Sequence, residues 1–388
     1  MKERLRVAVV GAGKWARAAH LPAFHRSPLA QLTVICDLKE DLARERAAEF
    51  GVPEITTDVE SVLRRDDIDV VDICTRGDHQ DLVFATLEAG KHCLVEKPVA
   101  SHYRDVWRAH EMAESRGLKT KVGLTFRHAP AMRYMLHLVR EGFVGQPYIF
   151  NGFEQNSQWL DPDVPMDKRD LEQRPEGERK IGADPRPEAI EVSSLEGYGA
   201  PIIDISLCAV GDELREVVGT MKNFVPYRRR TNLDTARERI NIDDASMYLG
   251  TYANGALCSI QTSYVTVGNY PGVEARIYGS EGALICRLVE EDGNCQTLHA
   301  AKPDSVEFQP LEVPREFFPP GYTPGEGWAS MFYANLVHDF MEEIVSGEAG
   351  NRGDFADSAR VQEIINAVER SFRERGWVQL PLEPRSTG

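Results

Sequence analysis

Paired cysteines, long apolar runs and an excess of basic residues are all missing from this 388-residue chain. Its seven cysteines are an odd number, and no two of them have CxxC spacing. This argues against a disulfide framework and a zinc ribbon, so we expect no bound metal and a reducing, cytoplasmic setting. No apolar stretch approaches the ~20 residues that cross a bilayer, and Leu5–Val10 is too short for a signal-peptide core, so we expect no membrane partner.

Basic residues are outnumbered by acidic ones, 45 against 61, which gives a formal charge of −16. A chain of this charge repels phosphate polymers at long range, so we expect no nucleic-acid partner. A dinucleotide is still allowed, because a helix terminus and backbone amides bind phosphate locally. Hydrophobic residues make up 42% of the chain, which is enough for a substantial core, and the length fits two domains.

The first third of the chain alternates between strand-like and helix-like segments. Short apolar runs typical of buried parallel strands lie at 4–10, 31–36, 69–74, 92–95 and 119–124. Helical patterns separate them, and one of these ends on Gly51, a plausible C-terminal cap. This alternation predicts an α/β Rossmann domain, a doubly wound parallel sheet, over residues 1–125.

The remainder, residues 126–388, predicts an α+β domain with a mostly antiparallel sheet. Its strand-like segments are longer and less often separated by helices, and Asn254-Gly255 between two of them is a strong hairpin signal. Two helical segments are expected within 329–374 at the end of the chain. A polar stretch at 157–199 is either a surface excursion or a loop that covers substrate.

A glycine turn follows the first predicted strand and opens a helix: Gly11-Ala12-Gly13-Lys14-Trp15-Ala16. In a GxGxxA turn the first glycine allows the tight bend, and the second lets the backbone approach a pyrophosphate. The alanine permits close packing of the helix on the strand. A GxGxxG-type motif is weak alone, but its strand–turn–helix context predicts a dinucleotide site here.

Asp37 stands at the end of the second predicted strand, about 20 residues after the turn. A carboxylate at this place hydrogen-bonds the adenosine ribose and repels a 2′-phosphate, which favours NAD over NADP. The alternative is that Asp37 only caps the helix that follows it.

Glu96-Lys97-Pro98 marks a resemblance to the Gfo/Idh/MocA family of oxidoreductases. The resemblance covers nearly the whole chain, including His20-Leu21-Pro22 and the later IYGSEGAL segment. It implies a Rossmann domain followed by an α+β domain whose large open antiparallel sheet joins subunits into a homo-dimer or homo-tetramer. Besides the glycine turn, it places at the cofactor Cys74, Thr75, His79, Glu96 and Lys97.

The resemblance also implies NAD(P)-linked hydride transfer at a sugar, cyclitol or related ring, with Lys97 beside the nicotinamide and the substrate hydroxyl. Loss of a hydride from a carbinol requires the hydroxyl to lose its proton, which an ammonium group favours by stabilising the alkoxide. The alternative for Lys97 is an ordinary lysine at a strand end. Arg127 is expected either to bind ligand or to form an ion pair.

The chain departs from the family at the usual Asp-x-x-x-His pair of the second domain. Asp204 keeps the acid, but Cys208 stands where the histidine is expected, and Ser206 replaces a usual glycine. We assign Asp204 to catalysis and both Asp204 and Cys208 to the substrate site. A neutral thiol is a poor replacement for an imidazole. Lys97 is then the only acid/base, another group such as Tyr198 relays the proton, or dehydrogenase activity is lost.

Two other functions stay open beside the dehydrogenase. A hydrolase or lyase that retains NAD would use transient oxidation to cleave a glycosidic bond. A non-catalytic dinucleotide sensor or assembly partner would explain the change at Cys208, although it leaves the intact Glu96-Lys97-Pro98 without a purpose.

Overall fold

The computed structural model describes residues 4–166, 190, 192–229, 231–269, 271–291, 293, 295–323, 325–348, 350 and 352–383. The chain forms two units: Met1–Pro130 with Phe318–Arg360, and Ala131–Phe317 with Val361–Gly388. Most of the polar stretch expected at 157–199 lies outside the described residues, so neither interpretation of it is tested. In the part of the chain that is described, no helix is both long enough and apolar enough to cross a membrane.

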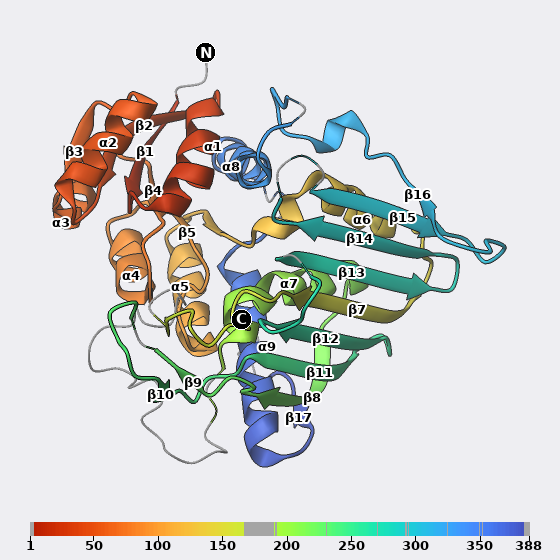
Figure 1. Ribbon diagram of the computed structural model, residues 1–388. Helices are drawn as coiled ribbons and strands as arrows, with labels where there is room; N and C mark the ends of the chain where they lie inside the picture. The colour runs from red at the N-terminus through yellow and green to blue at the C-terminus, as the bar shows by residue number, and fades with distance from the viewer. Residues whose placement is uncertain are drawn as a thin grey trace. The chain divides into compact units, whose positions relative to one another are not determined.

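The first unit holds a parallel sheet of six strands in the order β3-β2-β1-β4-β5-β6, with helices around it (Figure 1). The strands are β1 (Leu5–Val10), β2 (Ala30–Cys36), β3 (Glu54–Thr56), β4 (Val70–Ile73), β5 (His92–Val95) and β6 (Thr120–Val122). The helices are η1 (Ala16–His20), α1 (Leu21–Arg26), α2 (Glu40–Phe50), α3 (Val59–Leu63), α4 (Gln80–Glu88), α5 (Tyr103–Ser115), η2 (Thr125–His128) and α8 (Trp328–Ser346). The predicted doubly wound Rossmann sheet is confirmed.

Helix α8 comes late in the chain but belongs to the first unit. Its buried side chains, among them Leu336 and Phe340, join one apolar core with Val7 and Val70 of the parallel sheet. Burying side chains of this size contributes about 1.5–3 kcal/mol each, so the packing of α8 contributes substantially to the stability of this unit.

The second unit holds a nine-stranded sheet in the order β16-β15-β14-β13-β7-β12-β11-β8-β17. Its strands are β7 (Pro147–Gln155), β8 (Leu214–Lys222), β11 (Ala245–Tyr252), β12 (Leu257–Ser263), β13 (Gly272–Gly279), β14 (Ala283–Val289), β15 (Gln296–Ala301), β16 (Gln309–Pro310) and β17 (Val378–Gln379). The pairing of β7 with β12 is parallel, and the other pairings are antiparallel. The sheet is therefore mixed but mostly antiparallel, as predicted, and Asn254-Gly255 forms the expected turn between β11 and β12.

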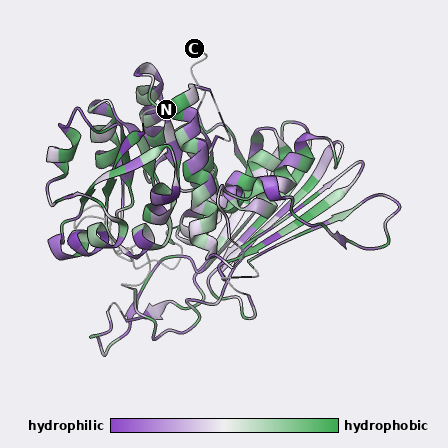
Figure 2. Cartoon of the chain, turned by 90° about the horizontal axis from the view of Figure 1, so that it is seen from above, coloured by the Kyte–Doolittle hydropathy of each residue, from purple (hydrophilic) through white to green (hydrophobic). Residues whose placement is uncertain are grey.

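The remaining elements of the second unit are α6 (Pro130–Arg140), which begins on the last residue of the first unit, η5 (Leu195–Gly199), α7 (Ala200–Val210), β9 (Tyr227–Arg228), β10 (Glu238–Arg239) and η6 (Arg315–Phe317). Helix α9 (Phe355–Glu374) starts in the first unit and ends in the second. Helices carry hydrophilic and hydrophobic residues side by side in Figure 2, as expected for amphipathic helices that cover a sheet.

One face of the nine-stranded sheet is covered and the other is exposed. Helix α7 approaches β7 so closely that a Cβ at Gly152 would lie 2.6 Å from Cγ1 of Ile202. On the opposite face, Ile149, Leu249 and Leu257 are exposed. Side chains alternate between the two faces along a strand, which accounts for buried Phe150 beside exposed Ile149.

Candidate functional site

The glycine turn lies between β1 and the helix that begins at Lys14. Gly11 has φ +106°, and a Cβ there would lie 2.7 Å from the carbonyl oxygen of Cys74, so only glycine fits. A Cβ at Gly13 would meet nothing within 4 Å, which leaves room for a ligand beside the backbone. Ala16 is fully buried, and Lys14 is exposed. The conformation is the one that a dinucleotide-binding turn requires.

Asp37 lies beside the same turn. Its Oδ2 accepts a hydrogen bond from the backbone N–H of Ala12 at 2.7 Å, and its Oδ1 accepts one from the N–H of Lys39 at 2.8 Å. Helix α2 has Lys39 as its N-cap residue, so Asp37 does not cap that helix. Each carboxylate oxygen keeps a second lone pair that could accept from a ribose hydroxyl.

Cys74, Thr75 and His79 form the support of the turn and of the segment after β5. The buried Cys74 thiol donates to the carbonyl of Gly11 at 3.0 Å, and burial raises its pKa well above the ordinary value. The two ring nitrogens of His79 lie 3.0 Å from the carbonyl oxygen of Thr75 and 2.7 Å from that of Pro98. His79 therefore links the end of β4 to the residue that follows Lys97.

Glu96 is the centre of a polar cluster in the first unit. Its Oε1 accepts from the indole Nε1 of Trp15 at 2.9 Å and from the hydroxyl of Tyr333 on α8, and it lies 3.2 Å from Nε2 of His20. A Cβ at Gly123 would lie 2.5 Å from the same oxygen, so a glycine is needed there. Burial would raise the pKa of Glu96, but these donors and the charges of His20 and Lys97 lower it to about 2.

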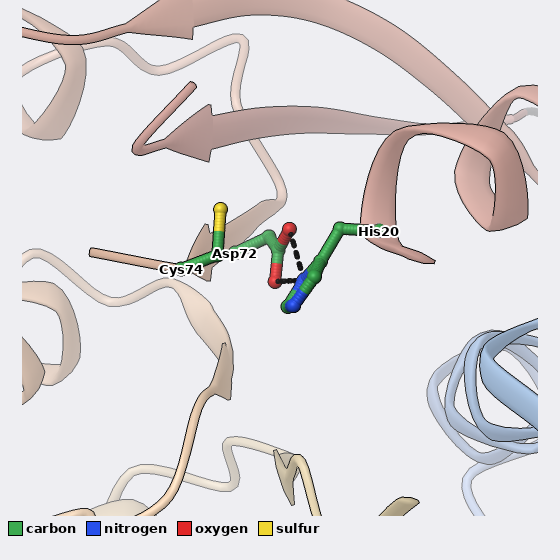
Figure 3. A group of neighbouring side chains, drawn as sticks. All are labelled: His20, Asp72 and Cys74. Atoms are coloured by element: carbon green, nitrogen blue, oxygen red, sulfur yellow. Dashed lines mark hydrogen bonds and ion pairs between the residues drawn. The ribbon is translucent and has the colours of Figure 1, made fainter. Parts of the chain in front are cut away.

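His20 connects Glu96 to a second carboxylate, Asp72 of β4. Figure 3 shows the contact between His20 and Asp72. Its Nδ1 lies 2.9 Å from both oxygens of Asp72. Burial alone would lower the pKa of His20, yet the two carboxylates raise it to about 9. Burial raises the pKa of Asp72, and the charge of His20 offsets part of that effect. The two ring nitrogens both face carboxylate oxygens, an arrangement that needs an N–H on each nitrogen and hence the imidazolium.

A metal ion fits this cluster poorly. His20, Asp72 and Cys74 have potential ligand atoms within 4.8 Å of one another, the one such group found in the part of the chain that is described. Metal ligation requires a neutral imidazole and a thiolate. Here the His20 nitrogens hold hydrogen bonds, the Cys74 thiol keeps its proton, and no interaction joins Cys74 to the other two in Figure 3.

Arg127 lies in η2 and is almost fully buried. Its Nη1 forms an ion pair with Asp357 at 2.8 Å. Burial would raise the pKa of Asp357, but Arg127 lowers it. Of the two interpretations of Arg127, the ion pair is present, and contact with a ligand stays a prediction.

Asp204 and Cys208 belong to the second unit, one turn apart on α7 and so on one face of that helix. Asp204 is buried, and Cys208 is partly exposed. The Ser206 hydroxyl donates to the carbonyl of Ile203 and accepts from Tyr252, which holds this residue within the helix and against β11. Lys97, in contrast, lies half-buried in the first unit.

Three residues of the Glu96 cluster were not predicted as site residues. His20 entered only through a short motif, and Asp72 and Tyr333 did not enter at all. Asp72 had a detectable signal, because a carboxylate inside a buried apolar strand needs a partner. Tyr333 had none, since 237 residues separate it from Glu96.

A segment of each unit matches a model of a known protein family. Residues 5–124 match the family model described as "Oxidoreductase family, NAD-binding Rossmann fold", and residues 196–285 match the "GFO/IDH/MocA C-terminal domain". Levoglucosan dehydrogenase of Pseudarthrobacter phenanthrenivorans is 25% identical over 407 residues, with 98% of this chain and 99% of that protein covered. The scyllo-inositol 2-dehydrogenase (NAD(+)) of Bacillus subtilis is 28% identical over 396 residues, with both proteins covered completely.

The solved structure of an oxidoreductase domain protein from Kribbella flavida is also similar in fold. Its TM-score is 0.82 at 27% identity, and the match covers 98% of this chain and 100% of that one. The two family matches and the geometry of the glycine turn agree. The chain belongs to the Gfo/Idh/MocA family of oxidoreductases, and its first unit carries the NAD-binding Rossmann fold of that family.

Proposed function

We propose that the chain is an NAD-dependent dehydrogenase or ketoreductase that transfers hydride at a CH–OH carbon of a sugar, cyclitol or related polyhydroxylated ring. Full-length similarity to levoglucosan and scyllo-inositol dehydrogenases supports this substrate class. The observation that carries the proposal is the fixed Glu96-Lys97-Pro98 segment. His20 contacts the side chain of Glu96 before Lys97, and His79 contacts the backbone carbonyl of Pro98 after it, all within the unit that contains the glycine turn.

The residues of the first unit fit NAD. The open space at Gly13 admits a pyrophosphate, and the partly exposed carboxylate of Asp37 offers acceptors to a ribose while repelling a 2′-phosphate. We infer that 1–125 holds the dinucleotide, with Lys14, Trp15, Cys74, Thr75 and His79 at or beneath it, and that 126–388 supplies the substrate site. When bound, NAD supplies the nicotinamide ring that exchanges the hydride.

In this proposal, Lys97 is the acid/base for the proton of the substrate hydroxyl. Its neutral amine accepts the proton that the substrate hydroxyl loses, and the ammonium so formed stabilises the negative charge on that oxygen before it releases the proton to water. Asp204 binds a substrate hydroxyl or tunes the charge near it. Cys208 fills volume at the substrate and takes no part in proton transfer, because a thiol beside a carboxylate keeps its proton.

The test is incubation with NAD and a panel of sugars and cyclitols that includes levoglucosan and scyllo-inositol. Net formation of NADH with at least one member supports the proposal. Cleavage of a glycosidic bond without net NADH would instead identify a hydrolase or lyase that retains its cofactor. Tight NAD binding with neither reaction across the panel would identify a non-catalytic sensor.

We also propose that the exposed face of the nine-stranded sheet joins two or four copies of the chain. Leu257 pairs in register with Ile149, and Leu249 on the adjoining strand points to the same face because it pairs with Ser259, two residues from Leu257; all three side chains are exposed. Light scattering tests this, with Leu249→Asp expected to reduce the molar mass. The free cysteines, among them Cys36 and Cys93, support a cytoplasmic location.

A further inference from the structure

We propose that His20 is a positioning residue for Lys97: its imidazolium joins Asp72 to Glu96 and thereby fixes the Glu96-Lys97-Pro98 segment. The inference deepens the proposed function and rests on it in one respect, the role of Lys97 in turnover. The contacts on which it depends lie within the first unit.

His20 balances the charge of two carboxylates in the cluster. Two carboxylates, Asp72 and Glu96, are largely withdrawn from water, with side-chain exposures of 0% and 13%. His20 is fully buried between them and is the cation that touches both. Removing a buried cation leaves its anionic partners uncompensated, which is strongly unfavourable. With Lys97 as an ammonium, the four groups sum to zero charge.

The hydrogen bonds of His20 also set the direction in which the Glu96 side chain points. An imidazolium donates along two fixed lines, from Nδ1 to Asp72 at 2.9 Å and from Nε2 to Glu96 at 3.2 Å. Asp72 belongs to β4 at the centre of the sheet, so it is a rigid anchor. Glu96 directly precedes Lys97, and its orientation therefore sets where the backbone of Lys97 begins. Neutral imidazole would turn a lone pair toward one of the carboxylates and lose that bond.

Contacts on its other sides leave the Glu96 carboxylate little room to move. Tyr333 and Trp15 donate to the same carboxylate oxygen, and a Cβ at Gly123 would lie 2.5 Å from it. The ring of Tyr333 also lies against that of His20, with centroids 4.3 Å apart. The charged and titratable groups around His20 are then Asp72 and Glu96, with Lys97, Tyr333 and Cys74 next to them.

The matched variants are His20→Asn and His92→Asn. The amide nitrogen of asparagine takes the place of Nδ1, so His20→Asn keeps a donor for Asp72 and loses the donor for Glu96. His92 lies at the start of β5, the strand that leads to Glu96, and its Nδ1 accepts a hydrogen bond from the backbone N–H of Lys119. His92→Asn therefore controls for the loss of a histidine from the first unit that does not contact Glu96.

Two measurements decide the inference. In wild-type protein labelled with ¹⁵N-histidine, the resonance that disappears in His20→Asn should show both ring nitrogens protonated at pH 7 and should titrate near pH 9. The indole N–H resonance of Trp15, which reports on Glu96, should shift in His20→Asn and stay in place in His92→Asn.

In turnover, kcat of His20→Asn should fall about 10- to 100-fold, the effect of one charge-assisted hydrogen bond, with the NAD affinity within about threefold of wild type. A neutral His20 at pH 7, an unmoved Trp15 signal or unchanged kcat would overturn the inference. If wild type turns over no carbohydrate, the proposed function fails, and the two resonance measurements still decide for or against the His20 link.

Discussion

Replacing Asp37 with alanine should narrow the preference for NAD over NADP by at least about tenfold. The variant loses one or two charge-assisted hydrogen bonds to the ribose, at about 1.5–3 kcal/mol each, so NAD should bind at least about tenfold more weakly. It also removes a repulsion of about 1–3 kcal/mol between the carboxylate and each unit of charge on a 2′-phosphate about 5 Å away. For NADP the two effects offset each other.

The assay is calorimetric titration of NAD and NADP into wild type, Asp37→Ala and the control Asp41→Ala. Asp41 is an exposed acid in the first turn of α2, so its loss changes the net charge equally without touching the ribose acceptor. Because Asp37 also accepts from Ala12, a melting curve should confirm that the variant is folded. Tighter binding of NADP than of NAD to wild type, or an unchanged ratio of the two affinities in Asp37→Ala, would contradict the role of Asp37 in selecting NAD.

Three further predictions concern catalysis, stability and pH. Cys208→Ala should change kcat less than about tenfold in steady-state assays, well below the 10²–10⁴ expected for an acid/base, whereas Asp204→Asn should cost more. Lys121→Met should lower the free energy of unfolding in urea by about 3–5 kcal/mol because it leaves Glu343 buried without its 2.6 Å partner. The pKa of His20 rises from 6.5 to about 9 on folding, so its protonation should stabilise the fold fully below pH 6.5, by about 3 kcal/mol at 1.36 kcal/mol per pKa unit. Denaturation at several pH values should show this stability lost as the pH rises to about 9.

The predictions on stability and on pH each have a control within the chain. Arg44→Met removes an exposed ion pair with Glu40 and should change stability by less than about 0.5 kcal/mol. A double variant that also replaces Glu343 with leucine should recover part of the loss in Lys121→Met. His20→Asn should remove most of the pH-dependent stability between pH 6.5 and about 9. Equal losses in Arg44→Met and Lys121→Met would contradict the role of burial.

Local patterns predicted the elements well because each depends on neighbouring residues. The strand ending at Val10, the cap at Gly51 and the hairpin at Asn254-Gly255 all follow from apolar runs or from residues suited to positive φ. The parallel pairing of β7 with β12 could not be predicted, because periodicity shows which face of a strand is apolar but not which strand lies beside it.

In the candidate site, too, residues in local motifs could be predicted and residues from distant parts of the chain could not. Motifs located Gly11, Asp37 and Lys97, whose local contexts are distinctive. The support beneath Glu96 stayed hidden because Tyr333 reaches it from α8, a helix that the sequence assigned to the other domain. Contacts between residues so far apart in the chain leave no periodic trace in the sequence.

The most direct test of the proposed hydride transfer follows deuterium from the carbinol carbon of a substrate to the nicotinamide. Wild type should deliver the label into NADH from at least one sugar or cyclitol. Lys97→Ala should do so at least about a hundredfold more slowly while binding NAD within about threefold of wild type. Label that never reaches NADH would contradict the proposed dehydrogenase function, and a Lys97→Ala variant that transfers it at nearly the wild-type rate would contradict the role of Lys97.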